Sequence, residues 1–519
     1  MIALTLAEIA EIAGGTLHID PLHIDPLHID PRHIDPQHEA DPLTVVHGPV
    51  EYDSRKVAPG ALFAAFVGEQ VDGHDFVPAA LAAGAVASLV SRPVAGPHIL
   101  VDDVLTGVTA LATAVSPRLT ATIIGVTGSS GKTSTKDLVA HVLSTAGRTV
   151  APAGSLNNEL GFPSTVLRAD EQTDFLVLEL GARGVGHISH LTAIARPSIG
   201  VVLNVGSAHL GEFGSRDAIA RAKGELVEAL PQGGVAVLNA DDRLVCAMEG
   251  RTSARVVTFG ESRAADVRAE NVALDDYGRA RFTLAAGAET APVTLHLVGE
   301  HHVSNALAAA AVGLECGLGL TQIAAALSSA TAESRWRMEV TERVDGVTVI
   351  NDAYNANPES MRAALKTLAT VQRARRAAVD GTVQRARRAD DDAGLARGGR
   401  GGARSFAVLG PMAELGDTTP IEHMDLGRFA VRLDISRVIA VGEAARPIQH
   451  GATLEGSWDG ESSWVPDVDA AVAMLRAELR PGDVVLVKAS RAASLERVAL
   501  AIVEDGAVTD STAGEDSGA

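Results

Sequence analysis

Short apolar runs alternate with longer segments of helical periodicity through the middle of the chain. The apolar runs lie at 123–126, 175–180, 199–204 and 235–239. After the first run, apolar residues recur at the spacing of one helix face, at Leu138, Val139, Val142 and Leu143. Runs that are apolar at nearly every position are typical of strands covered on both faces. We therefore predict a mostly parallel sheet between layers of helices.

The same alternation continues on both sides of this segment. Residues 44–120 show short strands and Ala-rich helices. From residue 334 on, strand candidates lie at 347–351, 405–410, 437–442 and 484–489, and helix candidates at 358–369, 421–432, 467–479 and 491–503. We predict an α/β fold with three domains, a central phosphate-loop domain, a Rossmann-like C-terminal domain and a small N-terminal domain. The predicted ranges are 1–119, 120–333 and 334–505, followed by a disordered tail at 506–519.

Two segments interrupt this pattern. Residues 18–37 repeat a five-residue unit that begins with HIDP. Units of five residues are too short for a solenoid, and each proline disfavours helix, so we predict an expanded loop. A His/Asp metal-binding tract is the alternative.

The second interruption is a basic insert at 371–404. TVQRARRA occurs at 370–377 and again at 382–389, followed by DDD and a Gly/Arg-rich stretch. We predict a solvated loop, because the chain as a whole is strongly acidic. A segment that binds RNA or anionic lipid is the alternative.

The charge balance argues against a general nucleic-acid binder. The chain has 65 acidic and 44 basic residues and a formal charge of −21. It has no uncharged apolar run long enough to span a bilayer, and its first residues resemble a short amphipathic helix more than a signal peptide. Cys246 and Cys316 are far apart in sequence, so we expect buried free thiols in a reducing compartment. These features predict a cytoplasmic monomer without stable membrane insertion.

A glycine-rich stretch after the strand at 123–126 is the strongest chemical signal. It opens a predicted helix and comprises Gly128, Ser129, Ser130, Gly131, Lys132, Thr133 and Ser134. Glycines let backbone amides turn toward phosphate oxygens, the lysine can reach the terminal phosphates, and the threonine hydroxyl suits Mg²⁺. The strict phosphate-loop spacing would place glycine at position 126, where Val126 stands. A glycine-rich turn that only caps a helix is the alternative.

Further stretches in the same order resemble the Mur ligase family, which shares this loop variant with folylpolyglutamate synthetases. The resemblance covers nearly the whole chain apart from the two inserts and the tail. It is carried by DSRKVAPGALF (53–63), SLNNELGFP (155–163), LELGA (178–182), NVGSAHLGEFGS (204–215), AKGE (222–225), NADD (239–242), GEHHVSNALAAAA (299–311), WRMEV (336–340), NDAYNANPESM (351–361), GPMAELG (410–416) and LVKASR (486–491).

Within the family, LNNELGFP and DAYNANPESM resemble the members that add D-alanyl-D-alanine. The resemblance implies an ATP-dependent ligase of peptidoglycan precursor synthesis, with ATP and Mg²⁺ as cofactors. It implies UDP-N-acetylmuramoyl-tripeptide and D-alanyl-D-alanine as substrates, joined through an acyl phosphate. The N-terminal domain would bind the UDP end, the central domain ATP, and the C-terminal domain the dipeptide.

The resemblance also assigns residues. Lys132, Glu179, His209 and Lys223 would be catalytic, with Thr133, Glu179, His209 and a carbamate on Lys223 as magnesium ligands. Besides the phosphate loop, the nucleotide would contact Asn158, His301, Asn305, Arg337 and Asp352. The other substrates would contact Asp53, Ser54, Arg55, Tyr354, Asn355, Asn357, Lys488 and Arg491. The chain departs from the family at His302, where asparagine is usual, and at Ala489, where glycine is usual.

Simpler structural roles are open for several of these residues. Glu179 could be an ordinary strand-end carboxylate, Lys223 an exposed helix lysine, and Arg337 with Asp352 a surface ion pair. Asp53 and Arg55 could pair within a turn. For the whole protein, the rivals are a related ligase with another amino-acid acceptor, and a phosphate-loop NTPase whose basic insert binds RNA or membrane.

Overall fold

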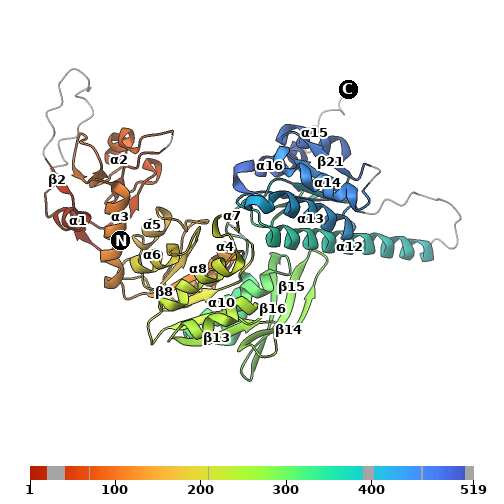
Figure 1. Ribbon diagram of the computed structural model, residues 1–519, viewed down its shortest axis with the longest axis horizontal. Coiled ribbons are helices and arrows are strands. Elements are labelled where there is room, and N and C mark those ends of the chain that lie inside the picture. Colours follow the sequence, from red (N-terminus) through yellow and green to blue (C-terminus); the bar gives the residue numbers. More distant parts are fainter. Residues whose placement is uncertain (20–40, 69, 208–209, 390–402, 458–459, 509–519) are drawn as a thin grey trace, which may run out of the picture.

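The computed structural model describes residues 1–19, 41–68, 70–207, 210–389, 403–457 and 460–508. Figure 1 shows an elongated arrangement in which the N-terminal, central and C-terminal parts of the chain follow one another along the long axis. Each of the three larger sheets draws its strands from one of the three predicted ranges. The α/β class is confirmed, whereas the boundaries at 119 and 333 stay predictions. In the described part of the chain, no helix is both long and apolar enough to cross a membrane.

The N-terminal part holds a five-stranded sheet in the order β2-β7-β6-β5-β4. The predicted amphipathic helix at the start is α1 (Leu6–Ala13), capped at Thr5 by reciprocal bonds with Glu8. The other elements are β1 (Leu4–Thr5), β2 (Thr16–His18), β3 (Val45–Val46), β4 (Val50–Glu51), β5 (Leu62–Ala64), α2 (Val77–Ala82), β6 (Ala87–Val90), β7 (His98–Leu100) and α3 (Val104–Val115).

The central part is built on a nine-stranded sheet in the order β16-β15-β14-β13-β12-β11-β8-β10-β9. Its strands are parallel from β9 to β14, with β8 between β10 and β11. The strands are β8 (Thr122–Thr127), β9 (Thr149–Val150), β10 (Phe175–Glu179), β11 (Ile199–Val202), β12 (Val235–Asn239), β13 (Arg255–Gly260), β14 (Val267–Leu274), β15 (Arg279–Ala286) and β16 (Glu289–Val298). The helices are α4 (Lys132–Ser144), α5 (Gly161–Val166), α6 (His187–Ile194), α7 (Leu210–Phe213), α8 (Arg216–Glu228), α9 (Arg243–Cys246), α10 (His302–Glu315) and α11 (Leu320–Ser329).

The C-terminal part holds a six-stranded sheet in the order β17-β18-β22-β19-β20-β21, parallel except for the edge strand β17. Its strands are β17 (Glu339–Glu342), β18 (Thr348–Asn351), β19 (Ser405–Leu409), β20 (Arg437–Val441), β21 (Ser462–Val465) and β22 (Val484–Lys488). Its helices are α12 (Pro358–Ala389), α13 (Thr419–Arg432), α14 (Arg446–Leu454), α15 (Val468–Glu478) and α16 (Glu496–Val508).

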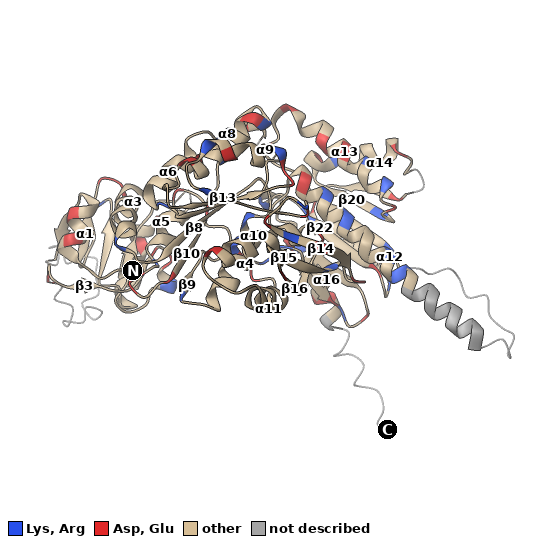
Figure 2. Ribbon diagram, turned by 90° about the horizontal axis from the view of Figure 1, so that it is seen from below, with Lys and Arg blue, Asp and Glu red and all other residues tan. Residues whose placement is uncertain are grey.

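The loop predicted from residue 371 is wrong for its first part, because α12 continues to Ala389 and projects beyond the sheet that it covers (Figure 1). Val371 and Gln372 are 2% and 1% exposed, and the side-chain amide of Gln372 lies between Ser405 and Ser436 at 2.6 and 2.9 Å. Gln, Arg and Ala are strong helix formers. The contacts of Val371 and Gln372 fix the beginning of this continuation against the sheet. Figure 2 places basic residues along the described part of α12.

Other predictions at the edges of the pattern also change. Helix α16 reaches Val508, so the tail predicted from 506 begins with helical residues. Residues 390–402 and 509–519 lie outside the described residues, as does nearly all of the HIDP segment beyond position 19. Both cysteines are free, as predicted, but neither is fully buried, because Cys316 is half-buried and Cys246 is exposed. It lies in the last turn of the short helix α9, at the surface.

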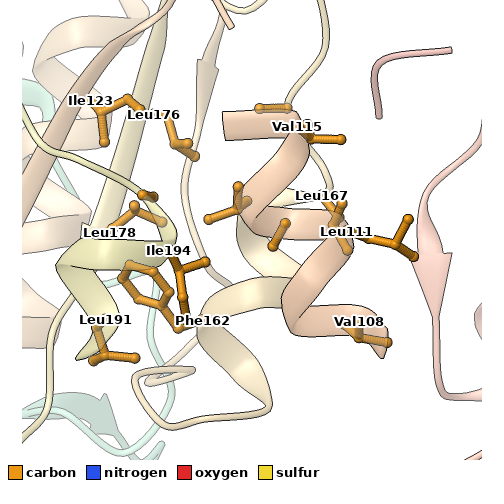
Figure 3. Close-up of a cluster of buried hydrophobic side chains, with 14 of the residues drawn as sticks. Val108, Leu111, Val115, Ile123, Phe162, Leu167, Leu176, Leu178, Leu191 and Ile194 are labelled. Carbon is orange, nitrogen blue, oxygen red and sulfur yellow. The ribbon is translucent and has the colours of Figure 1, made fainter. Parts of the chain in front are cut away.

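The N-terminal and central parts share one hydrophobic core. Helix α3 packs against α5 and α6, and one cluster of buried residues joins the two sheets across this contact (Figure 3). Leu111 of α3 and Phe162 of α5 are 0% and 1% exposed. Continuous apolar packing of this kind makes the two parts one mechanical unit.

Replacing Leu111 by Ala should test the shared core. The cavity left behind is expected to lower the free energy of unfolding by about 2–5 kcal/mol. Leu454→Ala on α14, where the side chain is 56% exposed, should change it by less than about 0.5 kcal/mol. Urea unfolding followed by circular dichroism measures both. A Leu111→Ala profile in which the N-terminal part alone unfolds early would contradict the single core.

Candidate active site

A cavity of about 560 Å³ lies between the central and C-terminal sheets. Its walls include the segments that follow β8, β10 and β11 on one side, and the segments that follow β18 and β22 on the other. The carboxyl ends of parallel strands are where ligands bind in open α/β sheets. Here two such edges face the same space, so groups from both domains meet.

The phosphate loop forms one wall of this cavity. Strand β8 ends at Thr127 and α4 begins at Lys132, with Gly131 at the helix N-cap. Gly131 has φ +81, and a Cβ there would lie 2.7 Å from the Asn305 side-chain oxygen, so only glycine fits. No side chain of the described residues caps α4. The first amides of the helix therefore face the cavity as donors suited to a phosphate.

Lys132 lies inside this wall. Its Nζ donates to the Gly128 carbonyl at 2.9 Å. Burial lowers the pKa of Lys132, which the Glu179 carboxylate opposes and the Arg337 guanidinium reinforces. An incoming anion would offset that burial, as expected of a lysine that binds phosphates.

Glu179 ends β10 and is 1% exposed. Its carboxylate accepts hydrogen bonds from Thr133 Oγ1 at 3.0 Å, Ser155 Oγ at 2.9 Å and Asn157 Nδ2 at 2.6 Å. Because the carboxylate is buried beside the phosphate-loop threonine, the alternative of an ordinary strand-end carboxylate does not fit Glu179. Sequence reasoning missed Ser155 and Asn157, although both lie in SLNNELGFP. It singled out Asn158, which lines the cavity while its Oδ1 accepts from Gly161 N at the start of α5.

Two of the predicted magnesium ligands lie side by side in the cavity. Glu179 and the Thr133 hydroxyl are oxygen ligands of the kind Mg²⁺ accepts together with phosphates and water. Among the described residues, no group of three or more His, Cys, Asp or Glu side chains could hold a metal. His209, the other predicted protein ligand of this type, lies outside the described residues.

Lys223 is not an exposed helix lysine. It is 3% exposed in α8, and burial together with the Lys132 ammonium lowers the pKa of Lys223 well below its ordinary value. Its neighbour Glu225 accepts from Gly186 N at 2.6 Å and Ser189 N at 2.9 Å, so α8 is fixed to the start of α6. Helix α8 is therefore fixed at this point, and the lowered pKa favours the neutral, nucleophilic form of the Lys223 amine. Lys223 itself is not among the residues that line the cavity.

Two adjacent histidines at the start of α10 also line the cavity. The rings of His301 and His302 are 4.3 Å apart. Burial lowers the pKa of His301 to about 4 and that of His302 well below its ordinary value. Both are neutral near pH 7. His302 Nδ1 lies 3.4 Å from Asn305 Nδ2, so the residue that replaces the usual asparagine still contacts the predicted Asn305.

Arg337 and Asp352 do not form the surface ion pair that was the simpler alternative. Arg337 reaches from the C-terminal part to Thr133 Oγ1 at 3.2 Å, and its guanidinium stacks on Tyr354 at 4.2 Å. Asp352 instead pairs with Lys488 at 2.6 Å, and Lys488 is 1% exposed. Burial lowers the pKa of Lys488, although Asp352 opposes the shift.

Segment 354–360 closes the cavity from the C-terminal side. Asn355 accepts a hydrogen bond from Lys488 Nζ at its carbonyl, and Asn357 Nδ2 donates to Ser129 O at 3.3 Å. Glu359, which sequence reasoning missed, accepts from Ser207 N at 2.8 Å and Ser207 Oγ at 3.1 Å. Its position in NPES gives no hint of this contact.

Arg491 reaches the same cavity from the segment after β22. It pairs with Glu496 at 2.7 Å, and its guanidinium stacks on Trp336 at 4.4 Å.

The three N-terminal candidates lie elsewhere. Asp53, Ser54 and Arg55 are not among the residues that line the cavity. They form a short 3-10 turn (Ser54–Lys56) in which Arg55 Nε donates to Asp53 at 2.8 Å, and the Arg55 side chain is 87% exposed. Their role toward the UDP end of a substrate stays a prediction.

Family models match three parts of the chain. The Mur ligase middle domain matches residues 126–313, the catalytic domain of the Mur ligase family matches 46–118, and the glutamate ligase domain of Mur ligases matches 336–399 and 393–491.

The chain belongs to the Mur ligase family.

Curated relatives of this Mur ligase cover most of its length. A UDP-N-acetylmuramoyl-tripeptide–D-alanyl-D-alanine ligase of Mycobacterium bovis is 50% identical, over 97% of this chain and 98% of the relative. The ligase of the same name in Escherichia coli is 35% identical, over 88% and 94%.

Solved structures of the same family are also similar to this Mur ligase. MurF from Acinetobacter baumannii is 29% identical with a TM-score of 0.75, over 97% of this chain and 99% of that one. MurF ligase from Thermotoga maritima in complex with ADP is 27% identical with a TM-score of 0.71, over 89% and 99%.

The buried pair Asp352–Lys488 gives a stability test. Lys488→Met leaves the Asp352 carboxylate without its ammonium and is expected to lower the free energy of unfolding by about 3–5 kcal/mol. The double variant Asp352→Asn/Lys488→Met should recover much of that loss, because the buried charge is removed as well. Lys366→Met on the exposed side of α12 is the control. Urea unfolding that shows equal losses in the single and double variants would contradict the pairing.

Proposed function

We propose that this Mur ligase joins D-alanyl-D-alanine to UDP-N-acetylmuramoyl-tripeptide at the expense of ATP. The observation that carries the proposal is the cavity that brings the phosphate loop and Glu179 opposite Asp352 and the segment 354–357. The relatives that share half or a third of its residues over most of their length bear this activity in their names.

The chemistry needs a cavity rich in cations. A carboxylate is a poor electrophile in water, and phosphorylation by ATP turns it into an acyl phosphate with a good leaving group. Negative charge gathers on the transferred group, and preorganised donors stabilise it. The amides of α4, the Lys132 ammonium and the Arg337 guanidinium are the donors that face this place.

Lys223 supports the proposal in a second way. An amine reacts with CO₂ only when it is neutral, and the pKa of Lys223 is lowered by burial and by Lys132. A carbamate on Lys223 would replace a buried positive charge by an anionic oxygen ligand. Mg²⁺, bound by Thr133, Glu179, His209 and that carbamate, would neutralise charge on the phosphates.

The second half of the reaction belongs to the C-terminal part. The dipeptide amine attacks the acyl carbon, and collapse of the tetrahedral adduct releases phosphate and leaves an amide. Tyr354, Asn355, Asn357 and Arg491 line the cavity as candidate dipeptide contacts. Lys488 Nζ donates to Asp352 and to the Asn355 carbonyl. Its role would therefore be to fix the segment 352–355, and not to contact the dipeptide.

Nucleotide contacts are assigned on both walls. Asn158, His301, Asn305, Arg337 and Asp352 complete the proposed nucleotide site around the phosphate loop.

The UDP end of the substrate would bind the N-terminal part near Asp53, Ser54 and Arg55. We expect no nucleic-acid partner, and the monomeric state and cytoplasmic location stay predictions.

Product analysis tests the function directly. With UDP-N-acetylmuramoyl-tripeptide, D-alanyl-D-alanine and Mg-ATP, mass spectrometry should find the amide-linked pentapeptide product together with ADP. Lys132→Ala should lower kcat/KM by about 100-fold or more, because a charge-assisted contact to the transferred group is lost. Lys366→Ala, on the exposed side of α12, should leave the rate unchanged. Faster ligation of glutamate or another single amino acid would favour the related ligases.

A deletion in the basic insert separates the ligase from an NTPase that binds RNA or membrane. The deletion must spare the helical turn at 371–377, whose residues contact the body of the domain. Arg376 Nε donates to Ala403 O at 3.1 Å, so 377 and 403 can be joined by a short glycine linker. Ligase activity should stay within about two-fold of the full chain, since the described residues that line the cavity all lie outside the removed segment. ATP hydrolysis stimulated by RNA or anionic vesicles, and lost on deletion, would support the rival.

A further inference from the structure

The phosphate loop of this chain is short. Only residues 128–131 separate the end of β8 from the start of α4. Val126, at the position of the first glycine in the strict motif, lies inside β8 and pairs with Glu179 on β10 and Val201 on β11. The loop therefore has fewer residues with which to surround a phosphate.

Asn204 makes a dense set of hydrogen bonds to this loop. Its Oδ1 accepts from Ser129 N and Ser130 N, both at 3.0 Å, and from Ser130 Oγ at 3.4 Å. Its Nδ2 donates to Ser130 O at 3.1 Å. Its own carbonyl accepts from Ser129 N at 3.1 Å. One side chain thus holds both serines of the loop.

The register of the central sheet explains why Asn204 lies beside the phosphate loop. In the parallel pair β11·β8, Val202 lies opposite Thr127. Two residues beyond each strand, Asn204 stands beside Ser129. The partner of the loop is therefore supplied by the neighbouring strand end.

We propose that Asn204 is the positioning residue of the phosphate loop. It turns the amides of Ser129 and Ser130 toward itself, so that the amides from Gly131 onward, at the start of α4, form the phosphate cradle. The proposal rests on the nucleotide site proposed above and adds a residue to it. Asn204 acts through the loop, whose two serines its side chain holds.

Asparagine is the side chain that this role requires. The site needs an acceptor for two amides and a donor for the Ser130 carbonyl on the same planar group. Aspartate would keep the acceptor but would set an oxygen against that carbonyl, and it would add a negative charge beside the phosphates. Alanine would leave the amides of Ser129 and Ser130 without their side-chain acceptor.

The loop is also fixed from its outer side. Ser129 Oγ accepts from Gly206 N at 2.9 Å, and Ser129 O accepts from Asn357 Nδ2 of the C-terminal part. In the contacts of the described residues, Ser130 is held by Asn204 alone. Loss of Asn204 should therefore free Ser130 first and disturb the cradle without detaching the whole loop.

Inhibition by ADP and by adenosine, each competing with ATP, tests the proposal. We expect Asn204→Asp to raise the inhibition constant of ADP by roughly 10-fold or more, and that of adenosine by less than about two-fold. Asn204→Ala should raise the inhibition constant of ADP less than Asn204→Asp does, because no charge is added. The KM for D-alanyl-D-alanine should stay within about two-fold. Asn271→Asp, the same change at an exposed site on β14, is the control and should behave as the unaltered chain.

Two results would overturn the proposal. One is an ADP constant within two-fold of the unaltered chain in both Asn204 variants. The other is an equal loss of ADP and adenosine binding, which would indicate general damage to the site. If Asn204→Ala does not fold, the nearly isosteric Asn204→Asp still decides. An unaltered chain that binds ADP but forms no amide would reject the proposed function while leaving this inference intact.

Discussion

The buried start of α4 is the constraint on which the rest of the structure depends. A helix that begins inside a cavity, without a side-chain cap from the described residues, directs its partial positive charge at whatever enters. Lys132 lies at that point, Arg337 reaches it through Thr133, and Lys223 is close enough to be affected by the charge of Lys132. Glu179 offsets part of this charge, so the part of the cavity at the start of α4 favours an anion.

The same constraint explains why both domains are needed. The side chains that shape the cavity stand at or just beyond the carboxyl ends of strands, such as Glu179 after β10, Asn204 after β11 and Asp352 after β18. Each sheet alone would present half of a site open to water. With the carboxyl ends of their strands facing each other, the two sheets form a partly enclosed space. Electrostatic interactions in such a space are stronger than in water.

Much of the fold could be predicted from the sequence, because buried parallel strands are apolar at nearly every position. The runs around β8, β10, β12 and β22 are of this kind. Strand β16 alternates exposed and buried residues, and the prediction, which relied on continuous apolar runs, missed it. The helical continuation of α12 was missed because its composition is that of a solvated segment, and only contacts such as those of Gln372 distinguish the two.

The residues of the candidate site also fall into those that the sequence could identify and those that it could not. Lys132, Thr133 and Glu179 could be named because their motifs carry chemistry in their spacing. Their partners Asn157 and Asn204 could not, since an asparagine after a strand looks like an ordinary turn residue. Burial decided other cases. Nothing in ARAKGEL indicates that Lys223 is almost fully buried, and nothing in NDAYNANP pairs Asp352 with Lys488 across 136 residues.

The common core of α3, α5 and α6 has a geometrical consequence. Because the N-terminal sheet cannot swing independently of the central one, the span between its surface and the phosphate loop is constant. A molecule anchored at the first place and reacting at the second must have a length that matches this span. If the UDP end of the substrate binds the N-terminal part as proposed, the apolar contact in Figure 3 would fix this length and favour precursors that match it.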